Sequence, residues 1–459
     1  MQDTDLMAKG KCREQAPETF FPSDGVSVEI AKRLCADCPE GQCDHGRRPA
    51  GQVPGTMRTA RLTVDLWSAD SFAHGQPHEQ FRWLREHDPV HWHEEPGGPG
   101  FWALTRHRDL KFVSRSPDLF SSQRGIMIPD GGLSDADHQM LLETDPPGHM
   151  AKRKLISSHF IPRAARALRP RIRELAQTIV DGVIESGQCD LAERVAGLMP
   201  SYVLADLLGI PLEDGVSLYP LTEAIHTAPG SQPPEATLKA VMRMLRYAHK
   251  VWKDKRAHPS DDISSVVANG WIDGVPIDEM DFSLYFSMLV GAGGDTTRNL
   301  VTGGVLALLE HPGELARLRA DVDGLLPTAI EEMLRWVSPF VYMRRTAKQA
   351  VRLGQTEIAA GDKVVMYYGA ANRDPEAFED PERLDLNRKP NDHVAFGGGG
   401  PHFCLGVHIA RIEIEELLRE VVTRMADLEL AGDPVWLQSN FVSGLKHLPV
   451  RYRPGARSG

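Results

Sequence analysis

The segment AFGGGGPHFCLGVHIAR, residues 395–411, decides how the rest of the chain is interpreted. Four glycines lead into Pro401, and Cys404 precedes by three residues a helical pattern, VHIARIEIEELLREVVTRM. A helix amino terminus lowers the pKa of a cysteine, and the thiolate is the form that binds metals. Glycines ahead of the helix let the backbone approach a bulky group and turn its N–H groups toward the sulfur. The alternative interpretation is a buried, inert cysteine that follows a flexible loop.

The remainder of the chain predicts one large domain that is mainly α with a small β region. The chain has 459 residues, of which 41% are apolar and 25% charged, an ordinary globular composition. Apolar residues recur at spacings of three and four in several long segments, which indicates helices. These segments are 167–187, 236–257, 281–311, 312–322, 327–337 and the stretch after Cys404. Short strand-like runs occur at 89–95, 101–107, 350–358 and 362–368.

The charge and hydropathy of the chain exclude several classes of protein. The net charge of −11 argues against a nucleic-acid-binding protein, which would need a basic surface. No apolar run approaches about 18 residues, so no membrane anchor is expected. The amino terminus is polar and has no signal-peptide core, which predicts a cytoplasmic protein.

The opening segment resembles the cysteine-ligand loop of the cytochrome P450 family. That loop contains Phe, Gly, His or Arg, Cys and Gly in this order, matched by Phe396, the glycine run, His402, Cys404 and Gly406. Phe396 precedes Cys404 by eight residues, one more than is usual, as in some actinobacterial relatives that hydroxylate sterols and methyl-branched lipids. The resemblance covers residues 60–455. It implies the P450 fold over 61–459, with Cys404 as the axial ligand of haem b.

Two motifs resemble the structural ion network of the family. EEMLRW, residues 331–336, matches its Glu-x-x-Arg helix through Glu332 and Arg335. NRDPEAFEDPERLDLNR, residues 372–388, matches the segment that supplies a second arginine, assigned here to Arg383. The resemblance implies a buried network behind the cysteine loop that supports folding and haem retention.

Other matching motifs imply residues that contact haem or oxygen. AGGDTT, residues 292–297, resembles the oxygen-activating helix, in which Thr296 positions water and oxygen and Asp295 relays protons. The haem propionates need cationic partners. The matching positions are His149, Arg153, Arg345 and His402, with Arg344 as a competitor of Arg345. By the same resemblance the substrate pocket is formed by 126–129, 221–225, Leu289, Ala292, 339–341 and 441–442.

The resemblance implies a haem-thiolate monooxygenase that inserts one oxygen atom of O2 into a C–H bond of a hydrophobic small molecule, such as a lipid, sterol or terpenoid. The chain has no recognisable flavin or NAD(P)H domain, so an external ferredoxin and ferredoxin reductase are implied. An alternative is a haem and iron–sulfur sensor of gas or redox state without turnover. A third interpretation is a haem-thiolate enzyme that performs dehydration or rearrangement without O2.

The first 45 residues contain Cys12, Cys35, Cys38 and Cys43, and residues 46–60 form a Gly-, Pro- and Arg-rich linker. In a reducing cytosol such a cluster indicates metal binding more than disulfides. APETFFPSDG and AKRLCADCP resemble the cluster-binding part of the WhiB-like regulators, which implies a 4Fe-4S cluster. A zinc site for docking and a relic or mis-assigned start upstream of Met57 are the alternatives.

Overall fold

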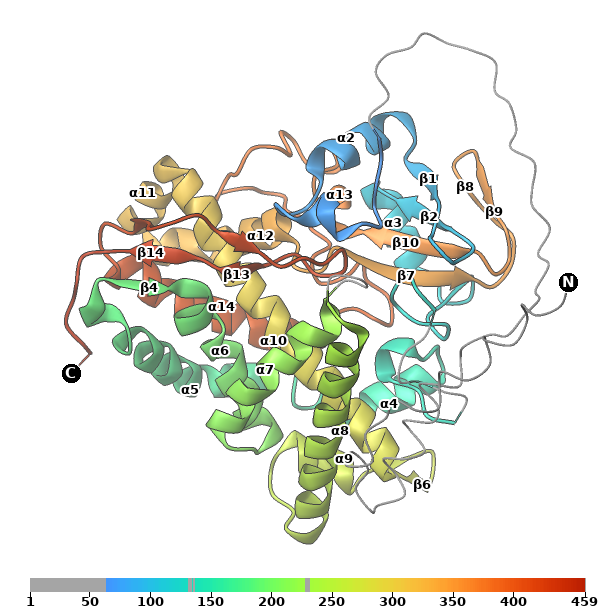
Figure 1. The fold of residues 1–459 in the computed structure, drawn as a ribbon, viewed down its shortest axis with the longest axis horizontal. Coiled ribbons are helices and arrows are strands. Elements are labelled where there is room, and N and C mark those ends of the chain that lie inside the picture. The colour runs from blue at the N-terminus through green and yellow to red at the C-terminus, as the bar shows by residue number, and fades with distance from the viewer. Residues whose placement is uncertain (1–62, 131–133, 135–136, 228–231, 459) are drawn as a thin grey trace, which may run out of the picture. The chain divides into compact units, whose positions relative to one another are not determined.

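A single long helix, α10 (Glu279–Glu310), runs through the centre of the fold (Figure 1). Its amino terminus is capped by Asp278, whose side chain accepts a hydrogen bond from the Asp281 N–H. The helix is apolar around most of its circumference, as expected for a helix enclosed by others. It packs against α6, α7, α8 and α12. Residues 292–297 therefore lie in the middle of the core.

The computed structural model describes residues 63–130, 134, 137–227 and 232–458, which belong to the unit Leu62–Gly459. The other α-helices in these ranges are α2 (His78–His87), α3 (His107–Arg115), α4 (Gly148–Ser157), α5 (Pro162–Asp181), α6 (Leu198–Leu208), α7 (Leu212–His226), α8 (Pro234–Ala257), α9 (Ile263–Ala268), α11 (Pro312–Ala320), α12 (Val322–Val337), α13 (Tyr368–Ala371) and α14 (Val407–Arg424).

The main β-sheet has the strand order β1-β2-β10-β7-β3. Its strands are β1 (Val90–His93), β2 (Phe101–Leu104), β10 (Lys363–Tyr367), β7 (Tyr342–Ala347) and β3 (Phe120–Ser121). Strand β10 pairs parallel with β2 and antiparallel with β7. A smaller sheet has the order β11-β14-β4, formed by Glu429–Leu430, Pro449–Arg451 and Gln188–Asp190. Two-stranded pairs join β5 (Trp271–Ile272) to β6 (Val275–Pro276), β8 (Val351–Leu353) to β9 (Thr356–Ile358), and β12 (Val435–Trp436) to β13 (Leu445–His447).

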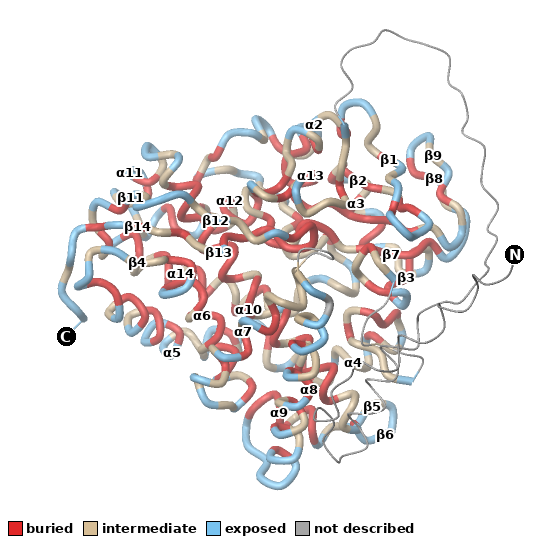
Figure 2. Tube along the Cα trace, viewed as in Figure 1, coloured by how far each residue is buried: buried red, intermediate tan, exposed pale blue. Residues whose placement is uncertain are grey.

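The buried residues form a large helical core and two smaller cores beside the main sheet (Figure 2). The helical core joins α5, α6, α10, α12 and α14. Successive residues of a strand point to opposite faces. Accordingly Val365 and Tyr367 enter one sheet core, and Val364 and Met366 enter the other. Strand β10 is therefore buried on both faces, which fixes the sheet firmly against α2, α3 and α13.

The expectation of a mainly α fold with a small β region is confirmed. The predicted helices correspond to α5, α8, α10, α11, α12 and α14, and the strand-like runs to β1, β2, the β8–β9 pair and β10. Helices α6 and α7 were not expected, because α6 is apolar on nearly all sides and both contain a proline, Pro200 and Pro220. Tertiary packing overrides these weak local signals.

The predicted cysteine-rich segment, with Cys12, Cys35, Cys38 and Cys43, and the linker at 46–60 lie outside the described residues. Among the described helices none is by itself long and apolar enough to cross a membrane. One bent pair, Ala192–Leu208 with Leu212–His226, meets that test by length and composition only.

Candidate active site

The loop before α14 closes on itself and packs against α3. The Cys404 N–H donates to the Phe396 carbonyl over 2.9 Å, which ties the two ends of the glycine run together. The Ser114 hydroxyl donates to the Gly399 carbonyl over 2.7 Å, and Arg115 Nε donates to the Gly398 carbonyl over 2.9 Å. The loop is therefore anchored to an adjacent helix through its backbone.

Two of the glycines show why this loop excludes side chains. Gly400 has a φ of +80°, and a Cβ there would lie 2.3 Å from the Ser114 carbonyl oxygen. Gly398 has an ordinary φ, but a Cβ would lie 2.9 Å from side-chain atoms of Leu110 and Ser114. Close approach to α3, together with the left-handed conformation that glycine tolerates, accounts for the glycine run.

Cys404 faces a cavity at the start of α14, with Gly406 as the residue before the first helical turn. Burial raises the pKa of the Cys404 thiol. The backbone N–H groups of Gly406 and Val407 act in the opposite direction, as do the charges of Arg153 and Arg411. These donors stabilise a thiolate, which is the form that ligates a metal. A Cβ on Gly406 would meet no atom within 4 Å, so the space beside Gly406 is open.

Four side chains form what we call the cationic end of the cavity: His149, Arg153, Arg345 and His402, which all line it. The rings of His149 and His402 lie 4.2 Å apart, and the Nδ1 atom of His149 is buried without a hydrogen-bond partner. Burial, followed by the nearby arginines, lowers the pKa of His149 to about 4 and that of His402 to about 2. An anionic group would relieve this crowding of positive charge.

The two arginines of β7 point in different directions. Arg345 lines the cavity and donates from Nη1 to the Arg344 carbonyl over 2.8 Å. Arg344 is fully buried and does not line the cavity. Its Nη2 atom lies 2.6 Å from Asp130 Oδ1. Adjacent residues of a strand face opposite sides, so only one of them could reach the cavity. The structure thus places Arg345 at the cavity and assigns Arg344 to a separate ion pair.

The predicted oxygen-activating residues lie on the central helix, but they face different surroundings. Thr296 lines the cavity, and its hydroxyl donates to the Ala292 carbonyl over 2.9 Å. Asp295 is buried at 3% exposure and is bonded to α7. Its Oδ1 accepts from the Thr222 hydroxyl over 3.0 Å, and its Oδ2 lies 2.6 Å from His226 Nδ1. Sequence reasoning missed His226 and Thr222, because no local motif marks them.

The cavity holds about 1730 Å³ of space, part of it open to solvent, and most of its walls are apolar. Of the expected substrate contacts, Ile126, Leu289, Ala292, Pro339 and Phe340 line it. Residues Leu221, Phe441 and Val442 instead belong to the packed cores.

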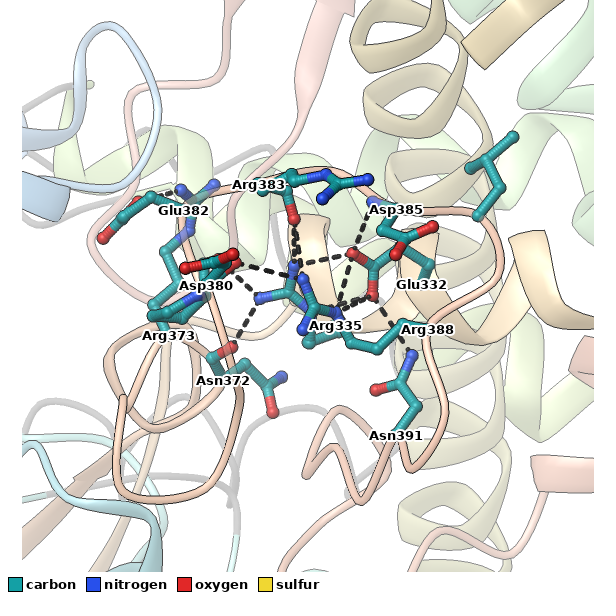
Figure 3. A network of polar contacts seen from close by, with 12 residues as sticks. Glu332, Arg335, Asn372, Arg373, Asp380, Glu382, Arg383, Asp385, Arg388 and Asn391 are labelled. Carbon is teal, nitrogen blue, oxygen red and sulfur yellow. Dashed lines mark hydrogen bonds and ion pairs between the residues drawn. The ribbon is translucent and has the colours of Figure 1, made fainter. Parts of the chain in front are cut away.

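The predicted ion network is present, with one correction (Figure 3). Glu332 and Arg335 are both fully buried, and two guanidinium N–H groups of Arg335 donate to the Glu332 carboxylate over 2.7 and 2.8 Å. The second arginine is Arg388, whose Nε lies 3.1 and 3.0 Å from the two carboxylate oxygens. Asn391 Nδ2 and the Asp385 N–H also donate to this carboxylate.

The assignment of this role to Arg383 was wrong. Arg383 is exposed, and its backbone carbonyl, not its side chain, joins the network by accepting from Arg335 and Arg388. Both arginines lie in the same polar segment, and the sequence spacing does not reveal which one turns inward. The path of this segment in the folded chain decides which of the two arginine side chains reaches Glu332.

Comparisons with known proteins identify the family. The family model described as Cytochrome P450 matches residues 277–426. A methyl-branched lipid omega-hydroxylase of Mycobacterium bovis is 37% identical over 405 residues, covering 85% of this chain and 94% of that protein. A steroid C26-monooxygenase of Rhodococcus jostii is 34% identical over 404 residues, covering 85% and 84%.

Among solved structures, the cytochrome P450 CYP268A2 of Mycobacterium marinum in complex with pseudoionone is similar, with a TM-score of 0.80. It is 36% identical, and the match covers 87% of this chain and all of that chain. The chain therefore belongs to the cytochrome P450 family. It is an oxidoreductase that incorporates oxygen from O2, as its named relatives are.

The family implies a haem cofactor, and the site fits one. An axial ligand needs a thiolate at the cavity wall, and Cys404 stands there with N–H groups directed at its sulfur. Two propionates need cationic or N–H partners, and the cationic end offers two arginines and the unpartnered Nδ1 of His149. The donor set and the open space at Gly406 agree with an iron porphyrin.

Proposed function

We propose that this enzyme hydroxylates a C–H bond of a lipid, sterol or terpenoid. The observation that carries the proposal is a cavity that has Cys404 in its wall and apolar residues over most of its remaining surface. Apolar walls favour an apolar substrate, because few polar groups are available to satisfy hydrogen bonds of a bound ligand. The named relatives act on methyl-branched lipids and on steroids, which supports this class.

In this proposal the Cys404 thiolate would hold the haem iron, and the haem would supply the redox chemistry that activates O2. The N–H groups of Gly406 and Val407 tune the charge on the sulfur. Phe396 packs beneath the guanidinium of Arg411, 4.7 Å from its ring centroid, and lines the cavity wall beside Cys404. His149, Arg153, Arg345 and His402, which line the cavity, would hold the haem propionates.

Asp295 and Thr296 are proposed to deliver protons on the α10 side of the cavity. Thr296 presents its hydroxyl at the cavity wall. Asp295 accepts a hydrogen bond from Thr222 and lies 2.6 Å from His226 Nδ1, and the His226 side chain is 15% exposed. A proton can thus enter at His226, pass to Asp295, and reach water that is held by Thr296.

We infer that electrons come from a ferredoxin and its reductase and enter near Cys404. The side chains of Phe112, Met150 and Phe403 are exposed at 43%, 53% and 38% on α3, α4 and the cysteine loop. Arg153 Nη2 donates to the Phe403 carbonyl over 2.8 Å, which joins α4 to this loop. Lys154 and Arg115 are exposed cations nearby, and an acidic electron-transfer protein would be attracted to them.

The test is a binding and turnover assay on the haem-containing protein. Branched fatty acids and sterols should displace the water on the iron, as seen in the haem absorption spectrum, and should give a hydroxylated product with ferredoxin, reductase and NADPH. If none of these compounds changed the spectrum and no product formed, the result would instead support a sensor of gas or redox state. Cys404→Ser should abolish the thiolate spectrum of the reduced carbon monoxide complex, and a variant that retained it would refute the ligand assignment.

A 4Fe-4S cluster on Cys12, Cys35, Cys38 and Cys43 stays a prediction that rests on the cysteine spacing and on the resemblance of the flanking segments to WhiB-like regulators. Iron and acid-labile sulfide per chain, on protein purified without oxygen, test it. About five irons with four sulfides would indicate a haem plus a cluster. One iron without sulfide would refute the cluster.

A further inference from the structure

One wall of the cavity belongs to a segment, residues 126–130, that contains no helix or strand. Its first residue, Ile126, lines the cavity. The segment follows Ser122, whose hydroxyl oxygen lies 3.2 Å from Nε2 of His402 at the cationic end. Because the backbone groups of such a segment are not paired within a helix or a sheet, they need partners elsewhere in the fold, and those partners decide where Ile126 lies.

Arg344 of strand β7 is the main partner of this segment. Its Nη1 atom lies 3.1, 3.1 and 3.4 Å from the carbonyl oxygens of residues 127–129. Its Nη2 atom lies 2.6 Å from Asp130 Oδ1, and its backbone N–H donates to the Ile126 carbonyl over 2.8 Å. Arg344 thus contacts every residue of the segment, and we call these contacts the Arg344 clamp.

Two neighbours of Arg344 on the same face of the main sheet also hold the segment. The Ile128 N–H donates to the Tyr342 hydroxyl over 3.2 Å, and Lys363 Nζ donates to the Ile128 carbonyl over 2.8 Å. The Lys363 ammonium group is paired with Glu95, whose two carboxylate oxygens both lie 2.8 Å from Nζ. Lys363 therefore has a charge partner that does not depend on the segment.

Arg344 differs from Lys363, because its charge partner belongs to the segment itself. Arg344 is fully buried, and among the described residues Asp130 is the one carboxylate with which it pairs. If the segment moved away, the guanidinium would lose Asp130 and the carbonyls together and would remain buried as an unpaired cation. Since an uncompensated buried charge is strongly unfavourable, the charge of Arg344 keeps the segment against β7.

We propose that Arg344 is a positioning residue that sets the substrate selectivity of the enzyme through Ile126. The clamp fixes the place of the Ile126 side chain before a substrate enters the cavity. A fixed apolar wall discriminates between substrates that differ by one methyl group, whereas a wall that can yield accepts both. The substrates that the clamp distinguishes are therefore apolar lipids that differ in their methyl branches. This inference rests on the proposed function, because it requires that such lipids occupy the cavity.

Amide hydrogen exchange on the haem-containing protein tests the clamp without a substrate. Arg344→Met removes the guanidinium and should speed exchange in peptides that cover residues 124–130, because the segment loses its main hydrogen-bond donor. Asp130 has a side chain that is 46% exposed, so water can solvate its carboxylate and the variant should fold. Should it not fold, Asp130→Asn removes the charge pair from the exposed side and should speed exchange in the same peptides. Unchanged exchange would overturn the proposal.

Ligand binding then tests the selectivity, with Arg319→Met as the matched control. Arg319 also donates to two backbone carbonyls, at the carboxyl end of α14, but it does not line the cavity or contact residues 126–130. The dissociation constants of two fatty acids of equal chain length, one straight and one with a methyl branch, are measured from the haem absorption spectrum. Their ratio should move toward one in Arg344→Met by up to about tenfold, which is typical of one such group in an apolar pocket. Arg319→Met should keep the wild-type ratio, and an unchanged ratio in Arg344→Met would overturn the proposal.

A double variant decides whether Arg344 acts through Ile126. Ile126→Ala should change the ratio of the two dissociation constants by itself, and adding Arg344→Met to it should change the ratio little further. Additive effects of the two substitutions would overturn the route through Ile126. If neither fatty acid altered the spectrum of the wild-type enzyme, the proposed function would be refuted together with the selectivity role, whereas the exchange measurement would still establish or refute the clamp.

Discussion

The Glu332 network and the cationic end of the cavity are both buried groups of charges, but only the first has its charges paired within the chain. Glu332 receives hydrogen bonds from Arg335 and Arg388, and the spare N–H groups of both arginines reach backbone carbonyls. At the cationic end, Arg153 and Arg345 donate only to carbonyl oxygens of the described chain. The first group is complete without a ligand, whereas the second has the donors that an anionic cofactor needs.

The difference has a physical basis. A buried charge with matched partners holds elements together, and removing one partner leaves the other charge stranded. A buried cation without an anion lowers the pKa of nearby histidines, as at His149, and is tolerated when a ligand supplies the opposite charge. We therefore expect mutations in the network to affect folding and mutations at the cationic end to affect haem retention.

The largest effect is expected for Glu332→Gln. The substitution leaves the charges of Arg335 and Arg388 without a carboxylate in a fully buried position. Stranding a buried charge typically costs about 3–5 kcal/mol, so the variant should give little folded protein. Denaturant unfolding followed by circular dichroism measures the loss. A variant with wild-type stability would show that the network does not support the fold.

Arg388→Met should cause the next largest loss of stability, and it tests whether Arg388, and not Arg383, is the second arginine of the network. The substitution removes the charge-assisted interaction of Arg388 with Glu332, while Arg335 still pairs with the carboxylate. A hydrogen bond to a charged group typically contributes about 1.5–3 kcal/mol to stability. The free energy of unfolding should fall by that amount. The measurement is the same denaturant titration, under the same conditions as for Glu332→Gln.

Arg345→Met should leave folding intact and weaken haem binding. The loss of one charge-assisted contact of about 1.5–3 kcal/mol corresponds to a roughly 10- to 150-fold weaker affinity. Haem transfer to apomyoglobin measures the retention of the cofactor. Burial, then Arg153 and then Arg345 lower the pKa of His149, so the variant should also raise that pKa in the apoprotein, which NMR titration can follow. Unaltered haem retention would remove Arg345 from the cofactor site.

The smallest effect is expected for Arg383→Met. Its side chain is exposed, and its contribution to the network is a backbone carbonyl that the substitution keeps. Surface substitutions of this kind usually change stability by less than about 0.5 kcal/mol. If Arg383→Met destabilised the protein as much as Arg388→Met, the two roles would have to be exchanged.

Much of the site could be predicted from sequence because its motifs are local. The glycine run, Cys404, and the i,i+3 pair of Glu332 and Arg335 depend on residues that are close in the chain, and helix periodicity places them. The mainly α fold follows from the same periodicity. Helix α6 was missed because a helix that is buried on nearly all sides has no contrasting polar face, and α7 because Pro220 interrupts its pattern.

Other features needed the tertiary structure because they join residues that are far apart in the chain. The choice between Arg388 and Arg383, and between Arg345 and Arg344, depends on which face of a loop or strand turns inward. The pairing of Asp295 with His226 spans 69 residues. The sequence by itself determined the family, the cysteine and the local motifs, since these rest on short-range spacing. Only the tertiary structure decided which charges are paired and which face the cavity, because burial and charge pairing depend on long-range packing.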